Sequence, residues 1–500
     1  MKRDPRDQLM DAIGEINDLT VQSARETLRR AFPWRAVSLA AACLALAVLA
    51  ATVLPTLRKA SPGGDPTPPS PGTHDGETKN LFALAQAVYP ETAPHPSEAD
   101  WAKGDDYANK LSEQWWAAQE ARREKAAVYT GALDGYLRAT APVFLSGENR
   151  ENRVYSPLNV YLALSMLAEL TDGDSRAQIL TLLGAPDVET VRQRAKALWE
   201  AHHQDDGLTT SVLAASVWLA EDLPFVPETL ETLARDYYAS TYQGAMGSPE
   251  LDAALQAWLN DQTGGLLQEQ AGQIRLQPET VLALATTVYF RTRWSDPFDD
   301  AATAPDTFRA PDGDVNCDFM HDYKVLRTVY AGDGFLALPV YLQDGAAMWL
   351  LLPDEGVTPE ELVQRGAAMD FLLSDKDACR QGNYLVNLSL PKFDVNSSVD
   401  LLPGLRALGV TDVLDDARSD FSPLTPTTGL YLSQCKHAAR VAVDEEGVTA
   451  AAFTVIGVCG SSLPQGEELD FTVDRPFFFA VTGEDGLPLF TGVVNTPTAG

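Results

Sequence analysis

The sequence predicts an α+β protein. Residues 81–199 show mostly helical periodicity, whereas strand-like runs dominate after residue 209. Helical segments followed by strands, without a regular strand-helix alternation, favour α+β architecture over a doubly wound sheet. The chain has 500 residues, of which 45% are hydrophobic and 22% charged. This is the composition of a folded globular protein, and the length fits one large domain with appendages.

The individual elements follow from local patterns. Amphipathic spacing predicts helices over 106–127, 158–170 and 188–200. Runs rich in β-branched and aromatic residues predict strands. These runs are Ser211–Leu219, Val281–Tyr289, Ala347–Leu352, Tyr384–Leu390, Arg440–Val443 and Phe477–Val481.

The N-terminal region has a separate organisation. An uncharged run from Ala36 to Leu54 follows a charged head, and about 20 such residues span a bilayer. We therefore predict a transmembrane signal anchor at 36–57, although a buried Ala-rich core helix is an alternative. More basic residues precede the run than follow it, which places residues 1–35 in the cytoplasm. A Pro/Gly-rich linker at 58–80 would then join this single-pass anchor to an extracellular domain at 81–500.

The charge balance bears on partners. Seventy acidic residues against 38 basic ones give a formal net charge of -32. Nucleic-acid binding needs a concentrated basic face, so we expect no nucleic-acid partner.

Motifs for metal, cofactor and nucleotide chemistry are absent from the sequence. The cysteines lie far apart, without metal-ligand spacing, so we expect neither a metal site nor a disulfide framework. They are Cys43, Cys317, Cys379, Cys435 and Cys459. His202 and His203 are adjacent and cannot share a helix face, so we expect a solvated surface pair. No cofactor is expected either.

Several colinear segments carry a family resemblance. They are Val154–Val160, Leu167–Leu170, Leu182–Gly184, Thr287–Trp294 with Pro297–Phe298, Leu390–Phe393, Leu408–Val410, Asp420–Ser422, Asp474–Phe477 and Leu489–Asn495. Each is weak alone, but in this order they resemble the serpin family of serine-protease inhibitors. The helical segment 85–130 looks longer than in many relatives.

The most informative segment resembles the serpin hinge that leads into the reactive loop. A loop that enters a sheet as a new strand must pass alternate side chains into the core, and these should be small or apolar. One face of the segment meets this requirement with Val448, Ala450, Ala452, Thr454 and Ile456. The predicted hinge comprises Glu445, Glu446, Gly447, Val448, Thr449, Ala450, Ala451 and Ala452.

The resemblance implies a fold and a mechanism. The fold would have a large central mixed β-sheet, smaller β-sheets, about nine helices and an exposed reactive-centre loop at about 446–468. A target protease cleaves the loop and forms an acyl-enzyme, and the loop inserts into the sheet before hydrolysis finishes. The protein would be an inhibitor without catalytic residues of its own, and we expect a monomer.

Four residues match positions that control sheet opening in the family. These sheet-opening gate residues are Ser156, Thr286, Trp294 and His437. Thr286 departs from the family, which usually has Asn opposite the histidine. Ser156, Trp294 and His437 are also compatible with satisfied core residues.

The reactive bond follows from counting along the loop. The family spacing from Glu445 gives Ser461-Ser462, and a shift of one or two residues would give bonds at Cys459 or Gly460. Small, uncharged residues before the bond predict elastase-like or subtilisin-like targets. An uncleaved anchor with a Pro-rich stalk fits a bacterial surface protein.

Two alternative functions remain at this point. The chain could be a non-inhibitory serpin-fold binding module at the cell surface. It could also be a cysteine hydrolase with Cys459 as nucleophile and His437 as base, although a Gly-flanked loop holds a thiol poorly.

Overall fold

The computed structural model describes residues 82–90, 92–129, 131–145, 150–265, 268–272, 274–448 and 466–497. The first half contains β1 (Ala83–Ala85), α4 (Glu98–Trp101), α5 (Asp105–Ala127), α6 (Asp134–Phe144), β2 (Arg153–Tyr155), α7 (Pro157–Leu170), α8 (Gly173–Leu182), α9 (Val188–His202), β3 (Gln204–Asp205), β4 (Thr210–Ala220), α10 (Pro227–Asp236), β5 (Ala239–Gly244), α11 (Pro249–Gln262) and α12 (Gln268–Gly272).

The second half is richer in strands. It contains β6 (Leu282–Arg293), η2 (Asp300–Ala302), β7 (Ala304–Ala310), β8 (Gly313–Gly332), β9 (Phe335–Tyr341), η3 (Gln343–Gly345), β10 (Ala347–Pro353), α13 (Pro359–Gln364), α14 (Ala367–Leu372), η4 (Lys376–Ala378), β11 (Gln381–Pro391), β12 (Phe393–Asp400), α15 (Leu401–Ala407), η5 (Asp412–Leu414), β13 (Lys436–Val443), β14 (Gly447–Val448), β15 (Glu468–Thr472), β16 (Phe477–Thr482) and β17 (Pro488–Val494).

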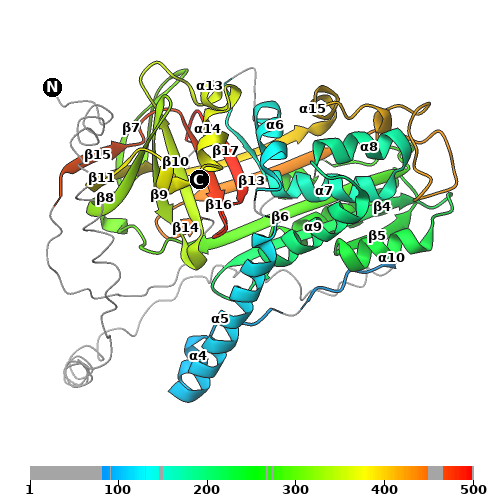
Figure 1. Cartoon of the computed structure of the whole chain (residues 1–500), viewed down its shortest axis with the longest axis horizontal. Coiled ribbons are helices and arrows are strands. Elements are labelled where there is room, and N and C mark those ends of the chain that lie inside the picture. Colours follow the sequence, from blue (N-terminus) through cyan, green and yellow to red (C-terminus); the bar gives the residue numbers. More distant parts are fainter. Residues whose placement is uncertain are drawn as a thin grey trace.

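The first sheet is mixed and has eight strands. Its order is β1-β5-β4-β6-β14-β13-β12, with β3 paired to β4. The pair β4–β5 is parallel and the other pairs are antiparallel. Helices α7 to α10 lie over this sheet, on the right in Figure 1. Residues 211–219 of β4 are all buried, as expected for a strand in the middle of a covered sheet.

The second sheet has nine strands. Its order is β15-β11-β8-β9-β10-β16-β17-β2, with β7 paired to β8. The long strand β8, with 20 residues, pairs with β7, β9 and β11 and so joins what the sequence analysis expected as separate smaller sheets. This sheet occupies the left of Figure 1.

Helix α7 forms the centre of the main core. All of its residues, 157–170, are buried, because the helix is apolar on almost every side. The Ser156 Oγ accepts a hydrogen bond from the Asn159 N–H at 3.2 Å and caps the first turn. A second apolar cluster lies on the opposite face of β6, where Leu255 and Trp258 of α11 pack.

The α+β class is confirmed, and the predicted helices correspond to α5, α7 and α9. The six predicted strands lie within or overlap β4, β6, β10, β11, β13 and β16. The pattern analysis did not predict β8, because exposed charged residues interrupt its apolar alternation.

The two adjacent histidines are not a solvated surface pair, so this expectation was wrong. His202 Nε2 lies 3.1 Å from Asp485 Oδ2. His203 is 9% exposed, stacks on Trp199 at 4.1 Å, and accepts the Leu213 N–H at 3.2 Å. Burial lowers the pKa of His203 to about 4. The two rings diverge because α9 ends between them.

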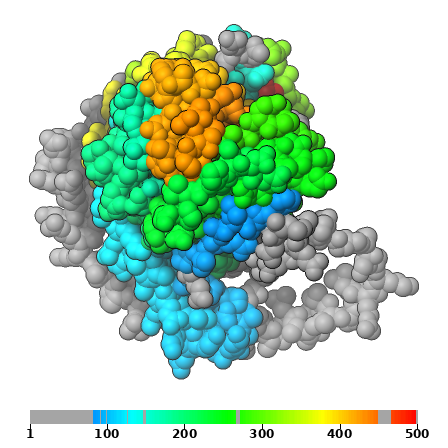
Figure 2. Space-filling model, turned by 90° about the vertical axis from the view of Figure 1, so that its right-hand side faces the viewer, coloured from blue at the N-terminus to red at the C-terminus, as the bar shows by residue number. Residues whose placement is uncertain are grey.

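The N-terminal part of the described chain begins with β1, an edge strand of the first sheet, and continues into α4 and α5. Helix α4 and the start of α5 project from the body, blue to cyan in Figures 1 and 2. The predicted segments 1–35, 36–57 and 58–80 lie outside the described residues. Within the part of the chain that the structure describes, no helix is long and apolar enough to cross a bilayer.

Candidate functional site

A strand position lies only partly filled between β6 and β13. Strand β6 pairs with β4 along one edge from residue 282 to residue 291. On its other edge, the pairing within the described ranges joins Arg293 and Thr292 to Gly447 and Val448 of β14. Strand β13 likewise pairs fully with β12, and its inner edge meets β14 only at Val443. Among the described residues, no ladder joins β6 directly to β13, although parts of the two strands have Cα atoms within 8 Å of each other. We name this stretch beyond Val448, which has no ladder between the described parts of the two strands, the vacant strand position.

One end of this position lies next to β14, and we call it the upper end. It is fixed by the turn that leads into β14. Three successive carbonyls of the turn accept hydrogen bonds from the end of β6 and the residues after it. The Trp294 indole Nε1–H donates to the Asp444 carbonyl at 2.8 Å, and the Trp294 amide donates to the Glu446 carbonyl at 3.0 Å. The Phe298 amide donates to the Glu445 carbonyl at 3.0 Å. Trp294, fully buried, therefore holds the hinge rather than the lower part of the sheet.

Gly447 is required for the close approach of β14 to β6. A Cβ atom at this position would lie 2.3 Å from the Thr292 carbonyl oxygen and 2.7 Å from Arg293 Cα. Both neighbours are backbone atoms, so no side chain can move away to make room. The first residue of β14 is thus specified by backbone packing.

Glu445 fastens the same turn through its side chain. Its Oε2 lies 2.7 Å from Lys392 Nζ, and its Oε1 accepts the Thr303 hydroxyl at 2.8 Å. Burial alone would raise the pKa of Glu445, but the bonds to Lys392 and Thr303 lower it overall. The sequence analysis did not assign Lys392 or Thr303. The only available signal was that Lys392 lies inside one of the family-like segments.

Two of the predicted gate residues, Ser156 and His437, meet at the end of β13 that is farther from β14, which we call the lower end. His437 is 3% exposed, and its Nε2 accepts the Ser156 N–H at 3.0 Å. Tyr155 meets the imidazole edge-on, with ring centroids 6.2 Å apart. Burial lowers the pKa of His437 to about 4, so the ring is neutral near pH 7. Two of the predicted gate residues, Ser156 and His437, are therefore in direct contact.

Continued by six residues, the register of Thr292, Val448 and Val443 would set Thr286 opposite His437. No hydrogen bond joins their side chains in the described part of the chain. Thr286 instead lines a cavity of about 90 Å³ together with Leu255 and Leu259 of α11 and Ala438 of β13. The lower end of the position thus contains space where the upper end contains β14.

Part of the predicted site cannot be placed. Thr449, Ala450, Ala451 and Ala452 of the hinge lie outside the described residues, as do the bond candidates Cys459, Gly460, Ser461 and Ser462. The hydrolase alternative loses its base, because the Nε2 of buried His437 already accepts a backbone N–H. No cluster of three or more possible metal-ligating residues occurs in the described ranges.

Comparison with known proteins agrees with this geometry. The family model "Serpin (serine protease inhibitor)" matches residues 143–497. This chain belongs to the serpin family. Serpin-Z4 of Arabidopsis thaliana is 31% identical over 374 residues, covering 70% of this chain and 93% of the relative. Serpin-Z1C of Triticum aestivum is 28% identical over 362 residues, covering 69% and 90%.

Solved serpin structures share the fold. Arabidopsis AtSerpin1 in its native stressed conformation has a TM-score of 0.64 and 25% identity, over 75% of this chain and 98% of that chain. The thermophilic serpin tengpin in its native state has a TM-score of 0.65 and 24% identity, over 73% and 94%.

The predicted localisation is contradicted and we correct it. A single-pass membrane serpin of bacterial type, with a cytoplasmic N-terminus, was expected from segment 36–57. The relatives named above are plant serpins, and no described helix could span a bilayer. The prediction relied on hydropathy, flanking charge and a Pro/Gly-rich linker, which describe the composition of a segment but not the structure it adopts.

Proposed function

We propose that this serpin inhibits serine proteases as a suicide substrate, by inserting its cleaved loop between β6 and β13. The vacant strand position carries this proposal. Its upper end already holds Gly447 and Val448, and the next residues of the chain are small and uncharged. Adding a strand there would satisfy two rows of backbone groups that have no ladder partner among the described residues.

The existing pairing gives the register of insertion. Val448 pairs with Thr292 of β6 and with Val443 of β13. Six residues further along the loop, an antiparallel strand would place Thr454 between Thr286 and His437. Side chains alternate, so Ala450, Ala452, Thr454 and Ile456 would face the main core, as buried Val448 does. The gate residues would then part to admit a small hydroxyl side chain.

The loop ends support the predicted boundaries. Strand β14 ends at Val448 and β15 begins at Glu468, which agrees with a reactive loop at about 446–468. We propose Ser461-Ser462 as the reactive bond, with Cys459 and Gly460 as alternative positions before the cleaved bond. Small residues there fit the shallow pockets of elastase-like or subtilisin-like proteases.

The test mixes the full chain with an elastase, a subtilisin and trypsin. We expect a covalent adduct, seen on a denaturing gel and by mass spectrometry, with the first two enzymes, and a cut after Ser461. Ser461→Arg should trap trypsin and lose the elastase adduct, because a trypsin-like pocket carries a buried carboxylate that needs a basic partner.

The outcomes separate inhibition from its alternative. Rapid cleavage without any adduct would contradict inhibition and support a non-inhibitory binding module of serpin fold. A cut outside 458–463 would refute the proposed bond but leave the insertion mechanism intact.

A further inference from the structure

Helix α5 contacts the serpin fold through a buried carboxylate. This helix precedes residues 143–497, which match the family model. Asp206, 3% exposed, accepts the Trp115 indole N–H at 2.6 Å and the Gln119 amide at 3.3 Å, both from α5. The Gln204 amide donates to the same carboxylate at 2.7 Å. A buried carboxylate is stable only when such donors surround it.

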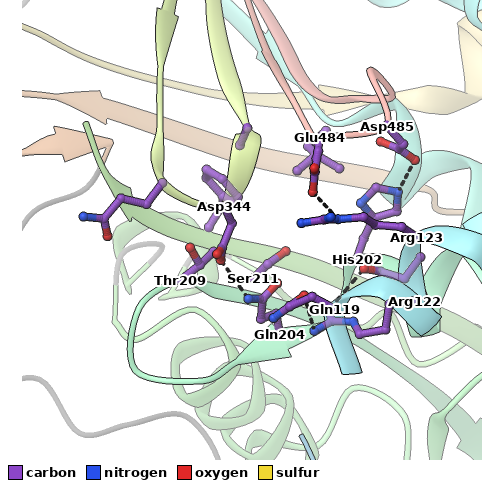
Figure 3. Close-up of a pocket in the computed structure, with 16 residues that line it drawn as sticks. Gln119, Arg122, Arg123, His202, Gln204, Thr209, Ser211, Asp344, Glu484 and Asp485 are labelled. Atoms are coloured by element: carbon purple, nitrogen blue, oxygen red, sulfur yellow. Dashed lines mark hydrogen bonds and ion pairs between the residues drawn. The ribbon is translucent and has the colours of Figure 1, made fainter. Parts of the chain in front are cut away.

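Arg122 of α5 makes a second attachment, visible in Figure 3. Its guanidinium donates to the carbonyls of Glu200 at 3.2 Å and Ala201 at 3.1 Å, at the C-terminal end of α9. These carbonyls have no partner within the helix, so an arginine from another element satisfies them.

The Asp206 carboxylate is connected to the hinge through two threonines. Asp206 Oδ1 accepts the Thr209 N–H at 2.9 Å, and the Thr209 hydroxyl lies 3.0 Å from the Thr292 hydroxyl. Both threonines are buried. Thr292 is the β6 residue that pairs with Val448. A continuous series of buried contacts therefore runs from Trp115 to the first inserted residues.

The same network also reaches the second sheet. The Gln204 amide that bonds Asp206 donates to Asp344 Oδ2 at 2.8 Å, and Asp344 lies between β9 and β10. Figure 3 shows Asp344 opposite Gln204. Arg123 of α5 pairs with Glu484 in the β16–β17 turn. Contacts from α5 thus reach both the first sheet and the second.

Insertion of a loop requires movement at this place. Strands on either side of an inserted strand stand about 9.6 Å apart, whereas parts of β6 and β13 have Cα atoms within 8 Å of each other, so insertion requires these parts to separate. Strand β4 shares a ladder with β6 from 282 to 291 and should move with it. The contacts of Asp206 join the start of β4 to α5 and to the second sheet, so they oppose that movement.

We propose that α5 restrains the opening of the first sheet and so sets the rate of loop insertion. Trp115 is the residue of α5 that donates to Asp206. Asp206 is the positioning residue, and it transmits the restraint through Thr209 to Thr292, which pairs with Val448. The consequence for inhibition rests on the proposed function, whereas the mechanical coupling does not.

The experiment compares Trp115→Phe with Trp116→Phe in the full chain by amide hydrogen exchange. Both variants remove one indole N–H, but Trp116 is 56% exposed, whereas Trp115 is 3% exposed. Loss of a hydrogen bond to a charged group should speed exchange at 290–293 and 447–448 about tenfold in Trp115→Phe only. Exchange in β16 should stay at the wild-type rate, and Gln119→Leu should give a smaller increase at the hinge.

Two results would overturn the proposal. Equal hinge exchange in Trp115→Phe and Trp116→Phe would show that α5 does not restrain β6. An equal rise in β16 would show general destabilisation instead. Adduct formation with elastase should accelerate in parallel with exchange. If no adduct forms with any protease, the proposed function fails, while the exchange result still decides the restraint.

Discussion

The two ends of the vacant strand position differ in how they are held. At the upper end, three carbonyls of the turn before β14 accept hydrogen bonds, Gly447 packs on backbone, and Glu445 pairs with Lys392. At the lower end, Thr286 and His437 share no hydrogen bond, and a cavity of about 90 Å³ lies beside them. The native sheet is therefore anchored where insertion would begin and loosely packed where it would proceed.

This difference has a physical consequence. A cavity, together with strand edges that lack a ladder partner among the described residues, costs free energy that an inserted strand would recover. A protein held in such a state is stable because of a barrier rather than an equilibrium. The anchored end would set that barrier, and the loose end would supply the driving force. The following predictions test this division, from the largest effect expected at pH 7 to the smallest.

Ala450→Arg should abolish adduct formation while cleavage continues. The register places residue 450 on the core face next to buried Val448, so insertion would bury an unpaired charge at a cost of several kcal/mol. Denaturing gels with elastase measure the ratio of adduct to cleaved product.

A matched pair controls for the charge itself. Ala450→Glu should behave as Ala450→Arg does, whereas Ala451→Glu, on the opposite face, should keep most of its adduct. Unchanged adduct yield in Ala450→Arg would disprove the register.

Gly447→Ala should destabilise the native state by about 2 kcal/mol, because the new Cβ meets the backbone of Thr292 and Arg293 and forces β14 away from β6. Denaturant unfolding measures the effect. Gly466→Ala is the control, since its Cβ would meet Leu385 at an ordinary 3.4 Å. Similar losses in both variants would contradict a special role for the anchored end.

Lys392→Met should cost about 1 kcal/mol of unfolding free energy. It removes the cation from Glu445, whose side chain is 12% exposed, but Lys392 itself is 36% exposed, so solvent screens part of the interaction. Lys324→Met, which breaks an exposed pair with Glu468, should have almost no effect. An equal cost in the two variants would mean that the Glu445 pair does not anchor the turn.

His437→Gln should have little effect at pH 7 but should change the response to acid. The pKa of His437 is about 4 in the folded protein and 6.5 in its ordinary state. Its contribution to stability is therefore complete above pH 6.5 and is lost as the pH falls from 6.5 to about 4. Gln keeps an acceptor for the Ser156 N–H without titrating, so the variant should lose about 3 kcal/mol less over this range.

Unfolding curves measured at pH 7, 5.5 and 4 give the comparison. His203, whose pKa is also about 4, still titrates in the variant, so part of the acid sensitivity should remain. A variant as acid-sensitive as the wild type would show that His437 does not remain neutral at the gate.

Local pattern was sufficient for most of the predicted elements, whereas the hinge stays a prediction. The predicted helix at 158–170 and the predicted strand at 211–219 correspond to α7 and β4, although α7 is buried on all sides rather than amphipathic. The alternating small or apolar residues after Gly447 can be recognised in the sequence alone, because a loop that inserts as a strand would need them on one face. The exposed strand β8 and the buried environment of His203 gave no such local signal.

Only the tertiary structure showed what holds the hinge in place. Lys392, Thr303 and Glu445 are far apart in the chain, and their contact depends on where β6, β12 and the turn before β14 meet. The same is true of Trp115 and Asp206, which are 91 residues apart. Sequence pattern determined which segments could become strands, and the family resemblance supplied the prediction of which loop inserts. The fold alone decided which strand edges lack a ladder partner, because pairing is a property of neighbours in space rather than in sequence.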